Sequence, residues 1–326
     1  MTIETVMLSG RQGRNFSPAL MMSCLAAPGV RGGRQGLPRR TRPPLITLGR
    51  PCQAHLHATE KAGEAARGSG EPSGRTMADL HDADTDEPSL SGKRAIITGG
   101  TTGIGRAIAI LLASYGVRVF ICGRTPEHLH DALERIREVG EGSGIALDLA
   151  EQGGVDRFFA AAHKYLGGLD IAVINAAVPA DGLTEMDAQD LRYAIATDFT
   201  AYITSAHTAC RLMGGNGHIV LIGSTSAHAP SPGSTVYAGM KAGIAAFSEA
   251  LTKELGSKGV KVSLVEPGFT SADFHYPELP AEKQDELIRE EKLLRAQDIA
   301  VGVRYLLTQP SRVVVQQLTI VPRLKA

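Results

Sequence analysis

From residue 90 onward, short β-rich segments alternate with helical segments, and this alternation limits the fold more than any other feature. Short apolar runs bounded by glycines predict strands, and longer segments with helical apolar spacing predict helices. We expect strands at 94–98, 117–121, 145–147, 171–174, 218–222, 260–265 and 318–321. We expect helices at 104–113, 127–139, 155–165, 191–213, 237–256 and 298–307. The alternation is typical of an α/β, doubly wound parallel sheet with helices on both faces.

The first 76 residues differ from the rest in composition. They contain 11 glycines, 7 prolines, and 11 Lys or Arg against 4 Asp or Glu. Such a segment cannot bury enough apolar surface to offset its ordering entropy, so residues 1–76 are predicted to be a disordered extension. Residues 77–89 read as an acidic leader, and 90–326 as a single folded domain. The extension resembles an organelle transit peptide, but we favour Met77 as the true start, after translated upstream sequence.

Several classes of protein find no support in the sequence. The four cysteines form no CxxC pair and the histidines no HExxH pair, so we expect neither a disulfide scaffold nor a metal site. No apolar run approaches the ~20 residues that span a bilayer. The basic extension has Phe16 as its one aromatic residue, which disfavours stacking on nucleic acid bases. We therefore expect a cytoplasmic protein without nucleic acid or membrane partners, with organelle import as the alternative.

A glycine-rich segment joins the first expected strand to the first expected helix. Gly99 permits a tight turn, Gly103 lets the backbone approach a pyrophosphate, and Gly105 lets the helix pack close to the sheet. Free N–H groups at the start of the helix favour phosphate. The dinucleotide-binding residues predicted here are Gly99, Thr101, Thr102, Gly103, Ile104 and Gly105.

The end of the second expected strand bears on the choice between NAD and NADP. An acidic residue there would bond the ribose 2′-hydroxyl and repel a 2′-phosphate. The chain instead has Gly123 and Arg124, and Thr125 can add a hydroxyl. A guanidinium pairs well with phosphate, so the sequence favours NADP over NAD.

Tyr237 and Lys241 open a long expected helix at a spacing that puts both on one face. An unperturbed phenol has a pKa of about 10. A nearby ammonium stabilises phenolate, so we expect Lys241 to lower the Tyr237 pKa. Ser224 follows the fifth expected strand, at the end where parallel sheets bind ligands.

These motifs, together with the turn at Asn175 and the pair Pro267-Gly268, resemble the short-chain dehydrogenase/reductase family in order and spacing over residues 90–326. The resemblance implies a Rossmann fold in which Tyr237 is the general acid/base. It implies that Lys241 binds the nicotinamide ribose and that Ser224 bonds the substrate carbonyl. It also implies cofactor contacts from Asp148 to adenine, from Asn175 beneath the nicotinamide half, and from Pro267, Gly268 and Thr270 or Ser271 near the carboxamide.

The chain departs from the family pattern at its proton-relay position. The family usually has asparagine where this chain has Asp198, so proton delivery is expected to differ, and Asp198 joins the predicted catalytic residues. The turn at Asn175 reads Asn-Ala-Ala in place of Asn-Ala-Gly. The segment 320–323 is similar to a subgroup of NADP-dependent reductases for aldehydes and small hydroxy acids.

The function expected from this pattern is hydride transfer between NADP(H) and a small carbonyl or secondary alcohol. The substrate loop is expected within 269–294, with Phe274, His275 and Tyr276 as lining residues. A dinucleotide-binding sensor without turnover is the alternative on the same fold. Small residues in the helix 237–256 suit a subunit contact in a homodimer or homotetramer, or else an intrachain core face. These residues are Ala238, Gly239, Ala242, Gly243, Ala245 and Ala246.

Overall fold

The computed structural model describes residues 87–271 and 279–324. The extension expected to be disordered, 1–76, and most of the acidic leader, 77–89, lie outside the described residues. Among the residues that are described, no helix is both long enough and apolar enough to cross a membrane.

Seven parallel strands form one sheet in the order β3-β2-β1-β4-β5-β6-β7. Ile96 of β1 pairs with Phe120 of β2 on one side and with Ala172 of β4 on the other. The chain therefore starts at the centre, winds to one edge and then to the other, which confirms the doubly wound fold. The strands are β1 (Arg94–Ile97), β2 (Arg118–Gly123), β3 (Gly142–Ala146), β4 (Ile171–Ile174), β5 (Gly217–Ile222), β6 (Val260–Pro267) and β7 (Gln317–Ile320).

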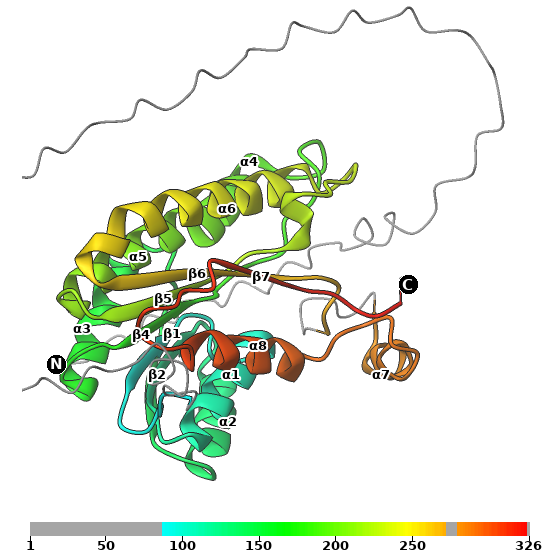
Figure 1. Ribbon diagram of the computed structural model, residues 1–326. Coiled ribbons are helices and arrows are strands. Elements are labelled where there is room, and N and C mark those ends of the chain that lie inside the picture. Colours follow the sequence, from blue (N-terminus) through cyan, green and yellow to red (C-terminus); the bar gives the residue numbers. More distant parts are fainter. Residues whose placement is uncertain (1–86, 272–278, 325–326) are drawn as a thin grey trace, which may run out of the picture. The chain divides into compact units, whose positions relative to one another are not determined.

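Helices cover both faces of the sheet (Figure 1). One face carries α1, α2 and α8, and the other carries α3, α5 and α6. The helices are α1 (Gly103–Ser114), α2 (Pro126–Arg137), α3 (Gly154–Leu166), α4 (Ala188–Ile195), α5 (Ala201–Met213), α6 (Thr235–Leu255), α7 (Ala281–Arg289) and α8 (Ala296–Leu307).

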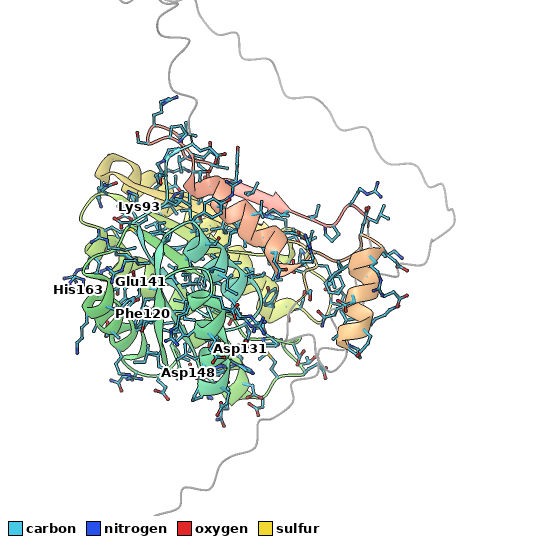
Figure 2. All side chains as sticks on the ribbon, turned by 90° about the horizontal axis from the view of Figure 1, so that it is seen from below. Lys93, Phe120, Asp131, Glu141, Asp148 and His163 are labelled. Carbon is cyan, nitrogen blue, oxygen red and sulfur yellow. The ribbon has the colours of Figure 1, made fainter. Side chains whose placement is uncertain are left out.

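The sheet divides the apolar core into two layers. Ile97 and Val119 face α1 and α8, whereas Ile96 and Phe120 face the layer of α3 and α5. The strands are nearly continuous apolar runs because both of their faces are covered. The ring of Phe120, labelled in Figure 2, lies 5.9 Å from that of Phe158 in α3, measured between centroids.

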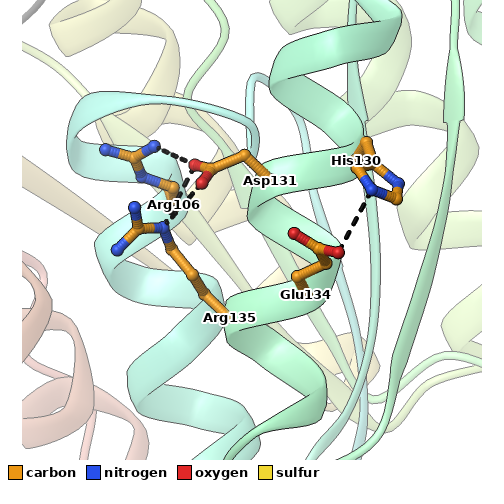
Figure 3. Close-up of polar contacts among 5 residues, drawn as sticks. All are labelled: Arg106, His130, Asp131, Glu134 and Arg135. Carbon is orange, nitrogen blue, oxygen red and sulfur yellow. Dashed lines mark hydrogen bonds and ion pairs between the residues drawn. The ribbon is translucent and has the colours of Figure 1, made fainter.

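A charged cluster joins α1 to α2 at the surface (Figure 3). Asp131 of α2 accepts hydrogen bonds from Arg106 of α1 at 2.8 Å and from Arg135 at 3.0 Å. The two arginines, Arg135 first, lower the pKa of Asp131. His130 and Glu134 form a further pair at 3.1 Å. Exposed ion pairs contribute little to stability, and of these pairs only Arg106–Asp131 joins the two helices.

Two helical segments differ from the sequence prediction. The helix expected at 191–213 is interrupted by a π-helical turn, Ala196–Thr200, between α4 and α5. Helix α7, for which we predicted no helix, lies inside 269–294, the range within which we expect the substrate loop. The sequence of α7 is strongly charged and gives no sign that the helix is anchored. Its anchor is Gln284, which accepts a hydrogen bond from the Ser271 hydroxyl at 2.6 Å and donates one to the Leu279 carbonyl at 2.9 Å.

Candidate active site

The polar residues singled out in the sequence lie at one edge of the sheet, where the strands end. β1 and β4 are neighbours, and after them the chain winds toward opposite edges of the sheet. Open α/β sheets bind ligands in the crevice at this switch point. The glycine loop follows β1, Asn175 follows β4, Ser224 follows β5, and Pro267 ends β6.

The loop between β1 and α1 is closely packed and leaves the start of the helix uncapped. Gly99 has a φ of +63°, in the region that favours glycine. A Cβ on Gly105 would lie 2.1 Å from the Gly99 carbonyl oxygen, so no larger residue fits there. Thr102 makes no side-chain capping bond, and the first turn of α1 contains no acidic residue. The N–H groups at the start of α1 therefore suit an anion.

Asn175 ties the end of β4 to this loop. Its Nδ2 donates to the carbonyl oxygens of Thr98 at 3.1 Å and Gly99 at 3.2 Å. Its backbone N–H donates to the Thr98 hydroxyl at 2.9 Å. The side chain therefore holds the two strand ends on either side of the switch point in a fixed relation.

One phenol joins two predicted cofactor contacts. The Tyr193 hydroxyl of α4 donates to Asp148 Oδ2 at 2.6 Å and accepts from Arg124 Nη1 at 2.9 Å. Asp148 is labelled in Figure 2. Burial, followed by the hydrogen bond to Asp148, raises the pKa of Tyr193, so the phenol keeps its proton. Sequence reasoning missed Tyr193, because 45 residues separate it from Asp148.

Gly123 has no space for a side chain. A Cβ built there would lie 2.2 Å from Oγ1 of Thr101, which is itself buried. An acidic residue at this strand end would therefore force Thr101 and the glycine loop to move.

Ser224, Tyr237 and Lys241 converge at the end of β5. Ser224 is buried and its Oγ accepts from the Ser226 N–H at 3.1 Å, which caps the 3₁₀ turn Thr225–Ala227. Tyr237 and Lys241 lie one turn apart in α6, and Lys241 Nζ is 5.5 Å from the centroid of the Tyr237 ring. Ser224 also interacts with the Tyr237 hydroxyl, and this interaction lowers the pKa of Tyr237.

The pKa of Tyr237 lies above its ordinary value. Burial is the largest cause, the Asp198 carboxylate adds to it, and the hydrogen bond to Ser224 opposes it. The lowering that we expected from Lys241 is not found. Lys241 Nζ is directed elsewhere, since it donates to the Ile222 carbonyl at 3.2 Å and to the Tyr202 hydroxyl at 3.4 Å. Tyr237 therefore carries its proton at neutral pH in this structure.

Asp198 lies in the π-helical turn and is fully buried. Its Oδ1 accepts from the Val178 N–H at 2.8 Å, while Oδ2 has no hydrogen-bond partner among the described residues. Burial raises the pKa of Asp198 to about 7, against the opposing charge of Lys241. π-turns are frequent at functional sites, and here the widened turn carries a carboxyl that titrates near neutrality.

The segment that follows β6 lies at the same edge of the sheet. Gly268 N–H donates to the Ile320 carbonyl at 2.7 Å, and the Thr270 hydroxyl donates to the Gly268 carbonyl at 2.9 Å. Thr270 also forms a parallel bridge with Leu294. The predicted lining residues Phe274, His275 and Tyr276 lie outside the described residues.

Comparisons with known proteins agree with this geometry. A family model described as short chain dehydrogenase matches residues 93–283. The chain belongs to this family. An uncharacterized oxidoreductase of Staphylococcus aureus is 32% identical, over 72% of this chain and 98% of that protein. This family member is accordingly an oxidoreductase, a class that coarsely matches the expected function.

Solved structures of short-chain dehydrogenases share the fold. One from Burkholderia cenocepacia, in complex with NADP, is 30% identical with a TM-score of 0.64. A short-chain dehydrogenase/reductase from Serratia marcescens is 27% identical with a TM-score of 0.64. Each alignment covers 72% of this chain and 98% of the other. The described residues also fit a dinucleotide, because the start of α1 has no side-chain cap and no acidic residue in its first turn.

Proposed function

We propose that the protein is an NADP-dependent reductase that transfers a hydride between NADP(H) and a carbonyl or secondary alcohol, with Tyr237 as general acid/base. The observation that carries the proposal is the convergence of Ser224, Tyr237 and Lys241 at the strand ends beside the uncapped start of α1. A protein that only binds a dinucleotide has no need of all three groups.

The glycine loop and the neighbouring strand ends would hold the cofactor. When bound, the nicotinamide supplies or accepts the hydride. The backbone N–H groups at the start of α1 would bind phosphate. Asn175 holds the glycine loop in place, and Lys241 would contact the nicotinamide ribose. The full set of proposed cofactor contacts is Gly99, Thr101, Thr102, Gly103, Ile104, Gly105, Arg124, Asp148, Asn175, Tyr237, Lys241, Pro267, Gly268 and Thr270.

The proton chemistry belongs to this chain's own side chains. Ser224 holds the substrate oxygen, and Tyr237 gives that oxygen its proton as negative charge develops. Burial and Asp198 raise the pKa of Tyr237 and so keep the phenol protonated, which is the state needed for reduction. The reductive direction itself rests on the expected use of NADP.

Arg124 supports NADP over NAD. Its guanidinium is exposed and gives one Nη1 bond to Tyr193, which leaves further N–H donors for a 2′-phosphate. Gly123 excludes the acidic side chain that would select the free 2′-hydroxyl. NADP in the Burkholderia structure is consistent with this preference.

A non-catalytic dinucleotide sensor is the second candidate, and Asp198 is the observation that favours it. A buried carboxyl replaces the family's asparagine, and it raises the Tyr237 pKa. Such a sensor would bind NADPH with no turnover of any carbonyl.

The small residues of α6 suit a homodimer or homotetramer. Gly239, Ala242 and Ala246 are exposed, whereas Ala238 is buried and Gly243 packs against Phe199. The helix therefore uses small residues on two faces, and the exposed face supports a subunit contact. Light scattering on the purified protein would measure the assembly.

Purified protein should be screened for NADPH consumption against ketones, aldehydes and quinones, beside Tyr237→Phe. We expect turnover of at least one class by wild type and its loss in the variant. Tight NADPH binding without any turnover would replace the reductase with the sensor.

A further inference from the structure

A histidine and a buried glutamate bridge the two segments that flank the candidate active site. Nε2 of His228 lies 2.7 Å from Oε1 of Glu266. His228 follows Ser224 by four residues, and Glu266 immediately precedes Pro267-Gly268. The pair therefore links the proposed substrate-binding turn to the segment proposed to face the nicotinamide.

The two side chains differ sharply in exposure. The side chain of His228 is 57% exposed, whereas that of Glu266 is 0% exposed. The glutamate is anchored on its other oxygen, since Gln317 Nε2 and the Thr319 hydroxyl of β7 both donate to Oε2. A buried carboxylate is costly unless it is paired, so Oε1 holds the imidazole in place from within the protein.

Glu266 also lies directly against the backbone that presents Ser224. A Cβ on Gly223 would lie 3.3 Å from Glu266 Cγ, and the Gly223 N–H donates to the Val265 carbonyl at 2.7 Å. The ends of β5 and β6 therefore position both the histidine and the serine.

The hydrogen bond to Glu266 determines which further hydrogen bonds the His228 imidazole can form. A carboxylate acceptor holds a proton on Nε2, and in the imidazolium form Nδ1 carries a second N–H that can donate to another acceptor. Among the described residues, none is hydrogen-bonded to Nδ1. His228 is also the one ionisable side chain in the segment 225–236.

We propose that His228, oriented by Glu266, binds a carboxylate on the substrate, so that the preferred substrates are short oxo acids. The inference rests on the proposed reductase function and names its substrate class. One imidazolium matches the single charge of a carboxylate, whereas a phosphate group is usually bound by several cationic side chains. Ser224 takes the carbonyl oxygen, His228 takes the acid group, and Glu266 acts as a positioning residue.

The test is calorimetric binding to the protein saturated with NADP⁺, so it does not depend on turnover. The probes are pyruvate, acetoacetate and 4-oxopentanoate, each beside its methyl ester, which removes the charge and keeps the carbonyl. We expect at least one acid to bind about 10-fold or more tightly than its ester, the scale of one charge-assisted hydrogen bond. His228→Leu should abolish that preference.

His163→Leu is the matched control. His163 is exposed in the last turn of α3, which leads into the start of β4 at the opposite end of the sheet, and it is labelled in Figure 2. Its replacement should leave the acid preference unchanged. Equal binding of every acid and ester by wild type, or a preference that survives His228→Leu, would overturn the inference.

Glu266→Gln tests the positioning role separately. The amide keeps the size of the side chain, so we expect a several-fold weaker acid preference with little change in ester binding. Combined with His228→Leu, it should weaken the preference no further. An intact preference in Glu266→Gln would remove Glu266 from the account. Because this readout is equilibrium binding, its failure is distinct from that of the reductase proposal, which a turnover assay with Tyr237→Phe decides.

Discussion

The two halves of the candidate site handle their charges in opposite ways. At the cofactor edge, Arg124 is exposed and Asp148 is half-buried. In the catalytic half, Asp198 and Lys241 are at most 2% exposed. Buried charges interact strongly because water screens them little. We therefore expect substitutions at the cofactor edge to change affinity, and substitutions in the catalytic half to change proton affinity, rate and stability.

The largest expected effect is in the catalytic half. Tyr237→Phe keeps the ring and removes the hydroxyl that is proposed to protonate the substrate. We expect kcat to fall by about 10²- to 10⁴-fold, the usual scale for a positioned acid/base. NADPH affinity, measured by fluorescence titration, should change little. A variant with nearly normal turnover would assign the proton to another group.

Asp198→Asn should raise stability at high pH. The folded pKa of Asp198 is about 7 against an ordinary 3.8. Its contribution is therefore fully present below about pH 4 and is lost as pH rises through 7. The loss amounts to at most about 4 kcal/mol, at 1.36 kcal/mol per pKa unit. We expect the asparagine variant to lack this pH dependence in urea unfolding between pH 5 and 8.

The same variant should keep or raise activity, because the amide removes the charge that raises the Tyr237 pKa and has donors as well as an acceptor. Asp285→Asn, an exposed change in α7, is the control for loss of one charge. A fall in activity of about 10-fold or more would give Asp198 its own part in proton transfer.

Arg124→Ala tests the cofactor edge. One charge-assisted bond contributes about 1.5–3 kcal/mol, so NADPH affinity should fall about 10- to 150-fold while NADH affinity stays nearly constant. Arg192→Ala is the matched control, since Arg192 is an exposed arginine on α4 that donates to its own helix at Ala188. Equal loss for both cofactors would make Arg124 a surface charge with no part in selection.

The structure also argues against one substitution that would otherwise be used to switch the cofactor preference from NADP to NAD. An acid at Gly123 is the obvious choice from the sequence, because it would repel a 2′-phosphate. The Thr101 hydroxyl occupies that space, at 2.2 Å from a built Cβ. We therefore expect Gly123→Asp to disturb the glycine loop and to weaken both cofactors, which titration with each would reveal.

Tyr193→Phe should give the smallest effect. It removes one hydroxyl from between Asp148 and Arg124. A hydrogen bond contributes about 0.5–1.5 kcal/mol in net terms, so NADPH affinity should fall about 2- to 12-fold. Unchanged affinity for NADPH would show that the bridge does not order the cofactor edge.

Sequence reasoning succeeded where the signal is local. Most of the strands are apolar runs and the glycine loop is contiguous, so both could be placed. β3 begins three residues before the expected position 145, and this start was missed because Gly142–Ala146 contains few apolar residues. Contacts between distant segments carried no such signal. The pairs Tyr193–Asp148 and His228–Glu266 span 45 and 38 residues, and the direction of Lys241 toward Tyr202 depends on how α5 and α6 pack.

The most direct test of the division between the two halves measures NADPH affinity and the single-turnover rate at saturating NADPH on the same samples. Wild type, Tyr237→Phe and Arg124→Ala would be titrated by NADPH fluorescence and then mixed with a carbonyl substrate in a stopped-flow instrument. The account predicts that Tyr237→Phe keeps its affinity and loses its rate, and that Arg124→Ala loses its affinity and keeps its rate. Near-wild-type turnover by Tyr237→Phe, or loss of the same quantity in both variants, would contradict it.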